Sequence, residues 1–147
     1  MATASERATL LAGVIRLLLL VVLALAGCSK ASDRLPVYPV HGKVLVGGEP
    51  ATEAFVAFHP APGNPAPAWI VGQVDAEGNF ALSTYVSGDG APEGDYTVTI
   101  TWQKRGGPLN RFIGPDRLKG RYAEPQTSKL RFRVEKKPVN GVPPYEL

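Results

Sequence analysis

The sequence is poor in the residues from which many functional sites are built. Its 147 residues include one cysteine and two histidines, so an internal disulfide and a four-cysteine zinc site are excluded by number. The 16 basic and 13 acidic residues give a net charge of +3, which is too small to indicate a dedicated nucleic-acid surface. We therefore expect no metal, no cofactor and no nucleic-acid partner, and a fold that its apolar core stabilises.

Long apolar runs are equally scarce, with a single exception near the N-terminus. The run LLLLVVLALAG extends from Leu17 to Gly27 and follows the basic residues Arg7 and Arg16. It is shorter than the roughly 20 residues that a helix needs to cross a membrane. Extending it backwards would bury Arg16 at a cost of about 2.5–3.5 kcal/mol, which disfavours a retained anchor helix. This layout predicts that residues 1–27 are a secretory signal peptide.

The single cysteine, Cys28, directly follows this run. Leu25, Ala26, Gly27 and Cys28 resemble the lipobox of bacterial lipoproteins, in which the cysteine receives a diacylglyceryl group and becomes the first mature residue. The resemblance implies attachment of lipid at Cys28 through two or three acyl chains, because one chain holds a protein to a membrane only marginally. The alternative is a chance cysteine at the end of an ordinary signal peptide.

The residues after Cys28 bear on location. In enteric bacteria an aspartate at the next position retains a lipoprotein at the inner membrane, so by resemblance to that rule Ser29 favours the outer membrane. We expect a lipid-anchored protein of the cell envelope whose domain is periplasmic or surface-exposed. Residues 28–36 are polar at first and then rich in proline, which predicts a flexible tether before the domain.

From residue 37 onwards, apolar residues recur with a period of two, which is typical of half-buried β-strands. The period is clearest over residues 38–46, 54–60, 69–74, 80–85, 96–102 and 130–136. In segment 96–102 the Tyr, Val, Ile and Trp residues should face the core, and the three threonines between them should face outward. Glycine and proline turns separate these segments. Residues 37–147 are therefore predicted to form an all-β, seven-stranded antiparallel β-sandwich of the immunoglobulin or transthyretin-like class.

Two connections are predicted in more detail. The sequence DAEGN at residues 75–79 predicts a tight turn that joins the strands on either side into a hairpin. Asp75, Glu77 and Asn79 also alternate like part of a calcium loop, but the remaining ligands are missing, so turn chemistry is favoured. The proline-rich residues 60–68 should form an exposed loop with partial polyproline character.

Three stretches of this pattern resemble a known family. HGKVLVGGEPATEAFVAFHP, GQVDAEGNFAL and EGDYTVTITW, in this order, are similar to the carboxypeptidase regulatory-like and transthyretin-like modules. The matching positions are Gly48, Pro50, Val56, Phe58, Asp75, Gly78, Phe80, Gly94, Tyr96 and Val98. The resemblance covers about residues 37–147. It implies a β-sandwich without catalysis of its own, often found on cell surfaces or appended to enzymes, and it names no ligand.

An enzyme is the alternative class. One transthyretin-like branch resembles a hydroxyisourate hydrolase that relies on histidines, an arginine and a C-terminal Tyr-Arg-Gly-Ser, whereas this chain ends in Pro-Tyr-Glu-Leu. His41 and His59 are expected on outward faces as surface imidazoles, without a third ligand or a paired carboxylate. We therefore expect a non-catalytic binding or structural module, with a transthyretin-like hydrolase or another cryptic enzyme as the alternative.

One loop carries a concentration of positive charge. Residues 103–121 contain six basic residues and one acidic residue, Asp116. The basic residues are Lys104, Arg105, Arg111, Arg117, Lys119 and Arg121. We expect contact with lipid head groups or acidic envelope polymers such as polysaccharide, or with another envelope protein, with Phe112 and Ile113 as apolar contacts. The alternative is a solvated loop without a partner.

Overall fold

The computed structural model describes residues 33–106, 109 and 111–147. All regular secondary structure in this part of the chain is β-strand, which confirms the predicted all-β class. No helix among these residues is long and apolar enough to cross a membrane. Residues Leu35–Leu147 form one compact unit, which begins two residues before the predicted start of the domain. The predicted signal peptide, the lipobox and Cys28 lie outside the described residues.

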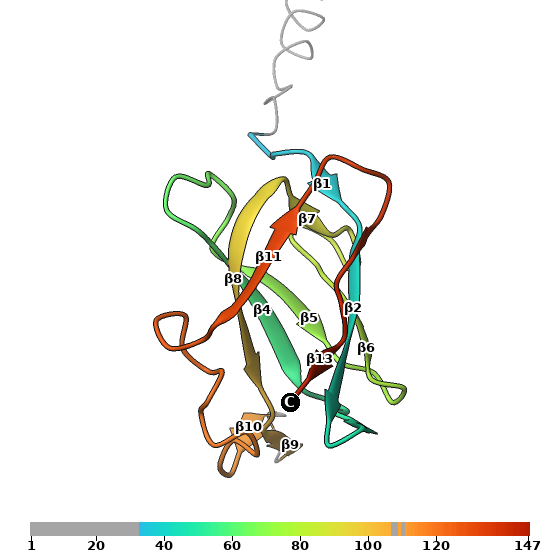
Figure 1. The fold of residues 1–147 in the computed structure, drawn as a ribbon, viewed down its shortest axis with the longest axis vertical. Helices are drawn as coiled ribbons and strands as arrows, with labels where there is room; N and C mark the ends of the chain where they lie inside the picture. Colours follow the sequence, from blue (N-terminus) through green and yellow to red (C-terminus); the bar gives the residue numbers. More distant parts are fainter. Residues whose placement is uncertain (1–32, 107–108, 110) are drawn as a thin grey trace, which may run out of the picture. The chain divides into compact units, whose positions relative to one another are not determined.

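The first sheet contains four antiparallel strands. These are β4 (Phe55–Pro60), β5 (Ile70–Gln73), β8 (Gly94–Thr101) and β11 (Leu130–Val134). Their spatial order is β11-β8-β4-β5, so β8 and β4 are the interior strands and β11 and β5 the edges (Figure 1). All neighbouring pairs are antiparallel, as the alternating pattern predicted.

The second sheet is built around β2 (Val40–Val46). The short strands β3 (Glu49–Pro50) and β6 (Asn79–Ala81) pair with β2 in antiparallel fashion. The C-terminal strands β12 (Asn140–Gly141) and β13 (Tyr145–Glu146) run parallel to it, so the predicted purely antiparallel arrangement is wrong for this sheet.

The parallel pairing follows from the way in which the chain leaves β11. The loop after Val134 carries it to the end of the sandwich where β2 begins, and the chain then descends beside β2 (Figure 1). The buried Asn140 side chain holds this loop, because it accepts a hydrogen bond from Glu135 N and donates one to Glu135 O. A segment that starts from the same end as β2 can only run in the same direction.

Two further strand pairs lie outside these sheets. At one end of the unit, β1 (Val37–Tyr38) pairs with β7 (Ala91–Pro92), and at the opposite end β9 (Lys104–Gly106) pairs with β10 (Arg111–Ile113) (Figure 1). The described residues contain thirteen strands, several of them only two residues long, so the predicted number of seven is not confirmed.

The predicted hairpin around residues 75–79 is only partly correct. The turn is present, since Asp75 N donates to Asn79 O and the Asp75 carboxylate accepts a hydrogen bond from Asn79 N. Strand β5, which precedes the turn, and strand β6, which follows it, belong to different sheets, however. The two segments of the chain are joined directly only by a bridge between Val71 and Ser83. The chain therefore crosses from one layer of the sandwich to the other at this turn.

The pairing of β6 with β2 depends on a glycine. Gly42 lies opposite Phe80, and a Cβ at Gly42 would stand 2.5 Å from the Phe80 Cζ atom and 2.9 Å from the Val142 Cβ atom. The space that a side chain would fill at position 42 is therefore occupied by the Phe80 ring. Since Phe80 is only 3% exposed, this cross-strand pair brings an aromatic ring from β6 into the core.

Both sheets face one apolar core. The buried members from the strands are Val40, Val44, Val56, Phe58, Ile70, Phe80, Tyr96, Val98, Ile100 and Val134. Phe58 lies at the centre of an aromatic cluster, with ring centroids 5.7 Å from Tyr96 and 5.9 Å from Phe132. This arrangement makes the fold sandwich-like, and it confirms the inward face predicted for Tyr96, Val98 and Ile100.

The threonines of β8 alternate with the core residues, as predicted, but Thr99 is buried on the outer face, because only 4% of its surface is accessible. The segment that precedes β11 runs along the same part of β8, where Tyr122 O accepts a hydrogen bond from Ile100 N and the Ser128 hydroxyl donates to Val98 O. The Thr99 hydroxyl lies 2.8 Å from His59 Nε2. The alternation within β8 could not predict that Thr99 is buried, because the residues that bury it are more than 20 positions away in the chain.

Two tyrosine hydroxyls are buried in contrasting ways. Tyr96 donates a hydrogen bond of 2.8 Å to Pro92 O, four residues upstream, which is the arrangement called a tyrosine corner in Greek-key sandwiches. The hydroxyl of Tyr145 is buried and has no hydrogen-bonding partner among the described residues. Burial raises the pKa of Tyr145 to about 12.

This contrast predicts opposite outcomes for the same chemical change. Tyr96→Phe should lower the free energy of unfolding by about 1–3 kcal/mol, because it leaves the Pro92 carbonyl without its donor. Tyr145→Phe removes a hydroxyl that has no partner, so it should be neutral or stabilise the protein by up to about 1 kcal/mol. Urea unfolding of both variants measures the difference, and an equal loss in the two would contradict this account.

Candidate functional site

The six basic residues predicted to contact anions divide into two groups. Lys104, Arg105 and Arg111 lie on the hairpin formed by β9 and β10. The other three, Arg117, Lys119 and Arg121, lie in the turns that follow it. We call residues 104–113 the basic hairpin and residues 114–121 the following turn. The side chains of Lys104, Arg111, Arg117, Lys119 and Arg121 are all exposed.

A single carboxylate organises the following turn. Asp116 Oδ1 accepts hydrogen bonds from Trp102 N at 2.8 Å and Leu118 N at 3.1 Å, and its Oδ2 accepts one from Gly120 N at 3.0 Å. The Arg117 guanidinium lies over the Trp102 ring, 4.7 Å from its centroid. Asp116 therefore fixes the backbone, and Arg117 already has an aromatic partner within the chain.

The basic hairpin also exposes large apolar side chains. Leu109 is 70% exposed, Phe112 45% and Ile113 47%. Phe112 packs edge-on against Phe55 of β4 with ring centroids 5.4 Å apart, which attaches the hairpin to the sandwich. Cations and apolar side chains thus share one projecting element, and such an element can bind a partner that has both anionic and apolar parts.

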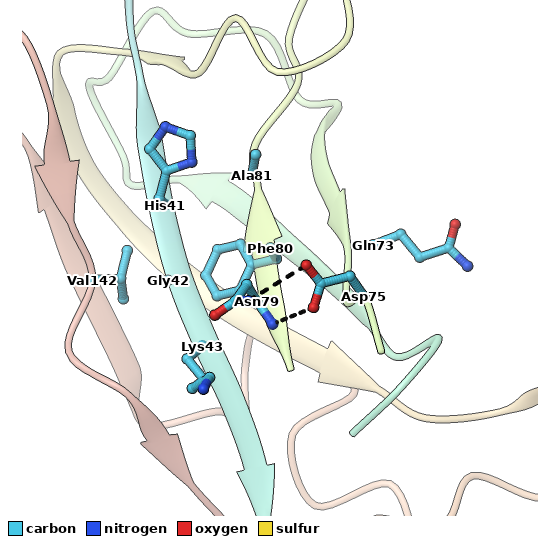
Figure 2. Close-up of a pocket in the computed structure, with 9 residues that line it drawn as sticks. All are labelled: His41, Gly42, Lys43, Gln73, Asp75, Asn79, Phe80, Ala81 and Val142. Carbon is cyan, nitrogen blue, oxygen red and sulfur yellow. Dashed lines mark hydrogen bonds between the residues drawn. The ribbon is translucent and has the colours of Figure 1, made fainter. Parts of the chain in front are cut away.

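An open hollow of about 450 Å³ lies beside β2, β5 and β6. Figure 2 shows His41 and Lys43 on β2 and Asn79 on β6 at this hollow, with the Asp75 carboxylate turned toward Asn79. Asp75 accepts hydrogen bonds from Glu77 N at 3.0 Å and Asn79 N at 2.7 Å. These bonds agree with the preference for turn chemistry over a calcium loop at Asp75, Glu77 and Asn79. Within residues 33–106, 109 and 111–147, no three His, Cys, Asp or Glu residues gather in a way that could hold a metal.

A larger hollow, of about 510 Å³, was not predicted from the sequence. Arg131 and Arg133 of β11 line it, together with Asp95 and Thr97 of β8 and the start of the proline-rich loop. Arg133 pairs with Asp95 at 2.7 Å, and Arg131 Nη1 donates to the Ser128 and Leu130 carbonyls. The signal that could have identified this site is the alternation in LRFRV, which places both arginines on the face of the strand opposite the core.

The structure separates the two histidines. His41 is exposed on β2, as predicted, whereas His59 of β4 is half-buried on the outer face of the other sheet. Burial lowers the pKa of His59, and the negative charge of Glu124 partly opposes this shift. The contact of His59 with the Thr99 hydroxyl combines the groups of an activated nucleophile, but the burial of Thr99 keeps its hydroxyl from a substrate. The hydroxyl of Ser128 is buried as well.

Comparison with known proteins adds little to this geometry. No family model matches the sequence, and no curated protein matches it. Among solved structures, the chain is similar to a 9R-lipoxygenase from Cyanothece PCC8801 with a TM-score of 0.43 and 10% identity, over 82% of this chain and 18% of that chain. The chain thus spans less than a fifth of the lipoxygenase, and a likeness of this size carries no argument about fold or function.

The environment of His59 predicts a loss of stability in acid. Because the folded state favours neutral His59, the folded chain binds fewer protons than the unfolded chain once the pH falls below the ordinary histidine pKa of about 6.5. The stability that neutral His59 contributes is therefore present above that pH and lost below it. His59→Gln should lose less stability than the wild type between pH 7.5 and pH 5, as urea midpoints would measure.

His41→Gln is the matched control, because it changes an exposed imidazole in the other sheet and should leave the wild-type pH dependence in place. The interpretation of His59 would be wrong if both variants lost as much stability as the wild type over this range.

Proposed function

We propose that this protein is a lipid-anchored component of a bacterial cell envelope, with a non-catalytic β-sandwich that acts as a binding module. Lipid attached to Cys28 would hold it at the membrane after export and cleavage of residues 1–27. The N-terminal sequence supports this proposal, since basic residues, an apolar run, small residues and the single cysteine follow one another in the order that a lipoprotein signal requires.

We further propose that the basic hairpin contacts acidic envelope polymers. The observation that carries this part is the position of the hairpin, at the end of the compact unit opposite β1 (Figure 1). The chain enters the compact unit at the β1 end, so the hairpin lies at the far end of that unit. We therefore propose a partner away from the anchoring leaflet over the lipid head groups of that leaflet.

The finer class of the sandwich also belongs to this proposal. The tyrosine corner at Tyr96, the turn at Asp75 and the buried Phe80 ring agree with what the carboxypeptidase regulatory-like and transthyretin-like pattern implies at these positions. In that class the sandwich is a stable support for exposed loops and faces, and binding specificity comes from the residues that these loops and faces present.

Lipid attachment is tested by expressing the full chain in a bacterium and measuring the mass of the purified protein. We expect the wild type to begin at residue 28 and to carry the added mass of two or three acyl chains, and to fractionate with membranes. Cys28→Ser should lack this mass and appear in the soluble fraction, because the signal would no longer have an acylated residue. A mature wild-type chain without acyl mass would refute the anchor.

The basic hairpin is tested with two variants of equal charge. Lys104→Gln/Arg111→Gln removes two cations from the hairpin, and Lys43→Gln/Lys136→Gln removes two from elsewhere on the surface. At about 1 kcal/mol for each cation near an anionic surface, the first variant should bind polygalacturonate roughly 30-fold more weakly at low salt. The second variant should bind like the wild type, because its cations lie away from the hairpin.

The same binding measurement, repeated with lipid vesicles, shows whether the hairpin binds a polymer or a lipid surface. Binding of the wild type to phosphatidylglycerol vesicles but not to polygalacturonate would reject the polymer as partner. Equal losses in the two variants would mean that net charge, rather than the basic hairpin, determines binding.

A further inference from the structure

A row of four side chains runs across the outer face of the four-stranded sheet, from β11 through β8 and β4 to the residue that precedes β5. In the register of the sheet, Arg131 of β11 lies opposite Thr97 of β8, and Thr97 lies opposite His59 of β4. Phe58 is paired with Ile70, the first residue of β5. Continuing this antiparallel register by one residue places Trp69, which directly precedes β5, opposite His59. The order across the sheet is therefore Arg131, Thr97, His59 and Trp69, which we call the outer row.

Trp69 is the most unusual member of the outer row. It is 79% exposed, although its neighbour Ile70 is completely buried, so the indole points away from the core. Tryptophan is the side chain that most often contributes strongly to binding at an interface, because it brings a large rigid surface and loses little conformational freedom. An indole exposed to this extent adds little to the fold itself.

The arginine end of the outer row opens into the hollow of about 510 Å³ described above. One wall of this hollow is formed by Ala61 and Pro62, and hydrogen bonds hold that wall in place. Asp95 O accepts one hydrogen bond from Ala61 N at 2.9 Å and another from Asn64 Nδ2 at 3.0 Å. The hollow is therefore formed before any ligand arrives, which lowers the entropic cost of binding.

The dimensions and chemistry of the outer row select the kind of ligand. Three strand spacings give a length of about 14 Å, which suits a stretch of extended polymer better than a small molecule. An indole face stacks on the C–H faces of sugar rings, while imidazole and hydroxyl groups exchange hydrogen bonds with sugar hydroxyls. Arg131 lies beside the Arg133–Asp95 pair and leaves positive charge at one end of the row. Its Nη1 donates to the Ser128 and Leu130 carbonyls, so the N–H groups of Nη2 and Nε are the ones that can donate to a carboxylate or phosphate.

A peptide fits this surface less well. Extended peptides gain their main-chain hydrogen bonds at the edge of a sheet, whereas the outer row crosses the interior strands β8 and β4. We propose that the outer row, with the adjoining hollow, is a binding site for an acidic glycan, in which Trp69 stacks on a sugar ring and Arg131 binds an acidic group. This inference rests on the proposed function as an envelope binding module, and it assigns recognition of the sugar to a surface distinct from the basic hairpin.

The test uses the full chain in detergent micelles and oligomers of polygalacturonate as the probe, with affinity measured by calorimetry. Trp69→Ala and Arg131→Gln should each weaken binding at least tenfold. The matched controls are Val86→Ala, an exposed apolar residue, and Lys136→Gln, an exposed cation; both lie outside the outer row and the basic hairpin and should retain wild-type affinity. Neutral dextran should bind more weakly than polygalacturonate, because it offers Arg131 no acidic group.

Indole fluorescence gives a second readout that does not depend on affinity. The other tryptophan, Trp102, lies away from the outer row, where its indole donates to Thr52 O and lies beneath Arg117. A ligand on the outer row should therefore change the emission of Trp69 and not that of Trp102. The change should persist in Trp102→Phe and disappear in Trp69→Phe, and the reverse result would overturn the proposal.

Three outcomes would reject the acidic-glycan site. Wild-type affinity in both Trp69→Ala and Arg131→Gln would show that the outer row does not bind the polymer. If affinity fell only in Lys104→Gln/Arg111→Gln, the proposed function would stand while this site would not. Equal affinity for polyglutamate, insensitive to Trp69→Ala, would mean that the surface recognises charge rather than sugar. The measurement is independent of acylation, so a failure of the lipid anchor would be seen separately by mass.

Discussion

The Phe80 ring lies over Gly42, and the rest of the domain depends on this contact between β6 and β2. The chain leaves the four-stranded sheet after β5, turns at Asp75 and enters the other sheet at Asn79. It can do so because residue 42 has no side chain, so the ring fits between the sheets. If β6 instead paired continuously with β5 in the same sheet, Phe80 and the buried Leu82 would have to find other surroundings.

This crossing determines which surfaces the molecule presents. With β6 in the second sheet, the four-stranded sheet keeps one face against the core and leaves the other available, apart from the part of β8 that residues 122–128 cover. The outer row and its hollow lie on that remaining face. The basic hairpin continues from the end of β8, and the packing of Phe112 on Phe55 holds it beside β4. Both proposed surfaces therefore belong to the strands that form the core, so core packing fixes their spacing.

The two surfaces suit different tasks. The basic hairpin projects, carries the exposed cations Lys104 and Arg111 and exposes three apolar side chains, which suits attraction to a polyanion with little selectivity. The outer row is flat and in register, with its members about one strand spacing apart, which suits discrimination between ligands. In the function that we propose, long-range attraction by the basic hairpin brings a polymer close before the outer row selects among sugars.

Much of the fold could be predicted from residues close together in the chain. Alternation identified the core faces of Val56, Phe58, Tyr96 and Val98, and the Asp75 turn followed from its side-chain oxygen and the glycine three residues later. These features are local because side chains alternate along any extended strand. The lipoprotein signal proposed at Cys28 likewise rests on the sequence alone, because Leu25, Ala26, Gly27 and Cys28 are consecutive residues.

Only the tertiary structure decided how distant segments meet. The parallel strands β12 and β13, the change of sheet between β5 and β6, and the cover over Thr99 all depend on contacts between residues far apart in the chain. The outer row is the clearest case. Arg131, Thr97 and His59 come from three strands and Trp69 directly precedes a fourth, so only the register of the sheet aligns them. A sequence with period-two alternation specifies which side of each strand is buried, but register is set by packing across the sheets, and that packing brings these four side chains together.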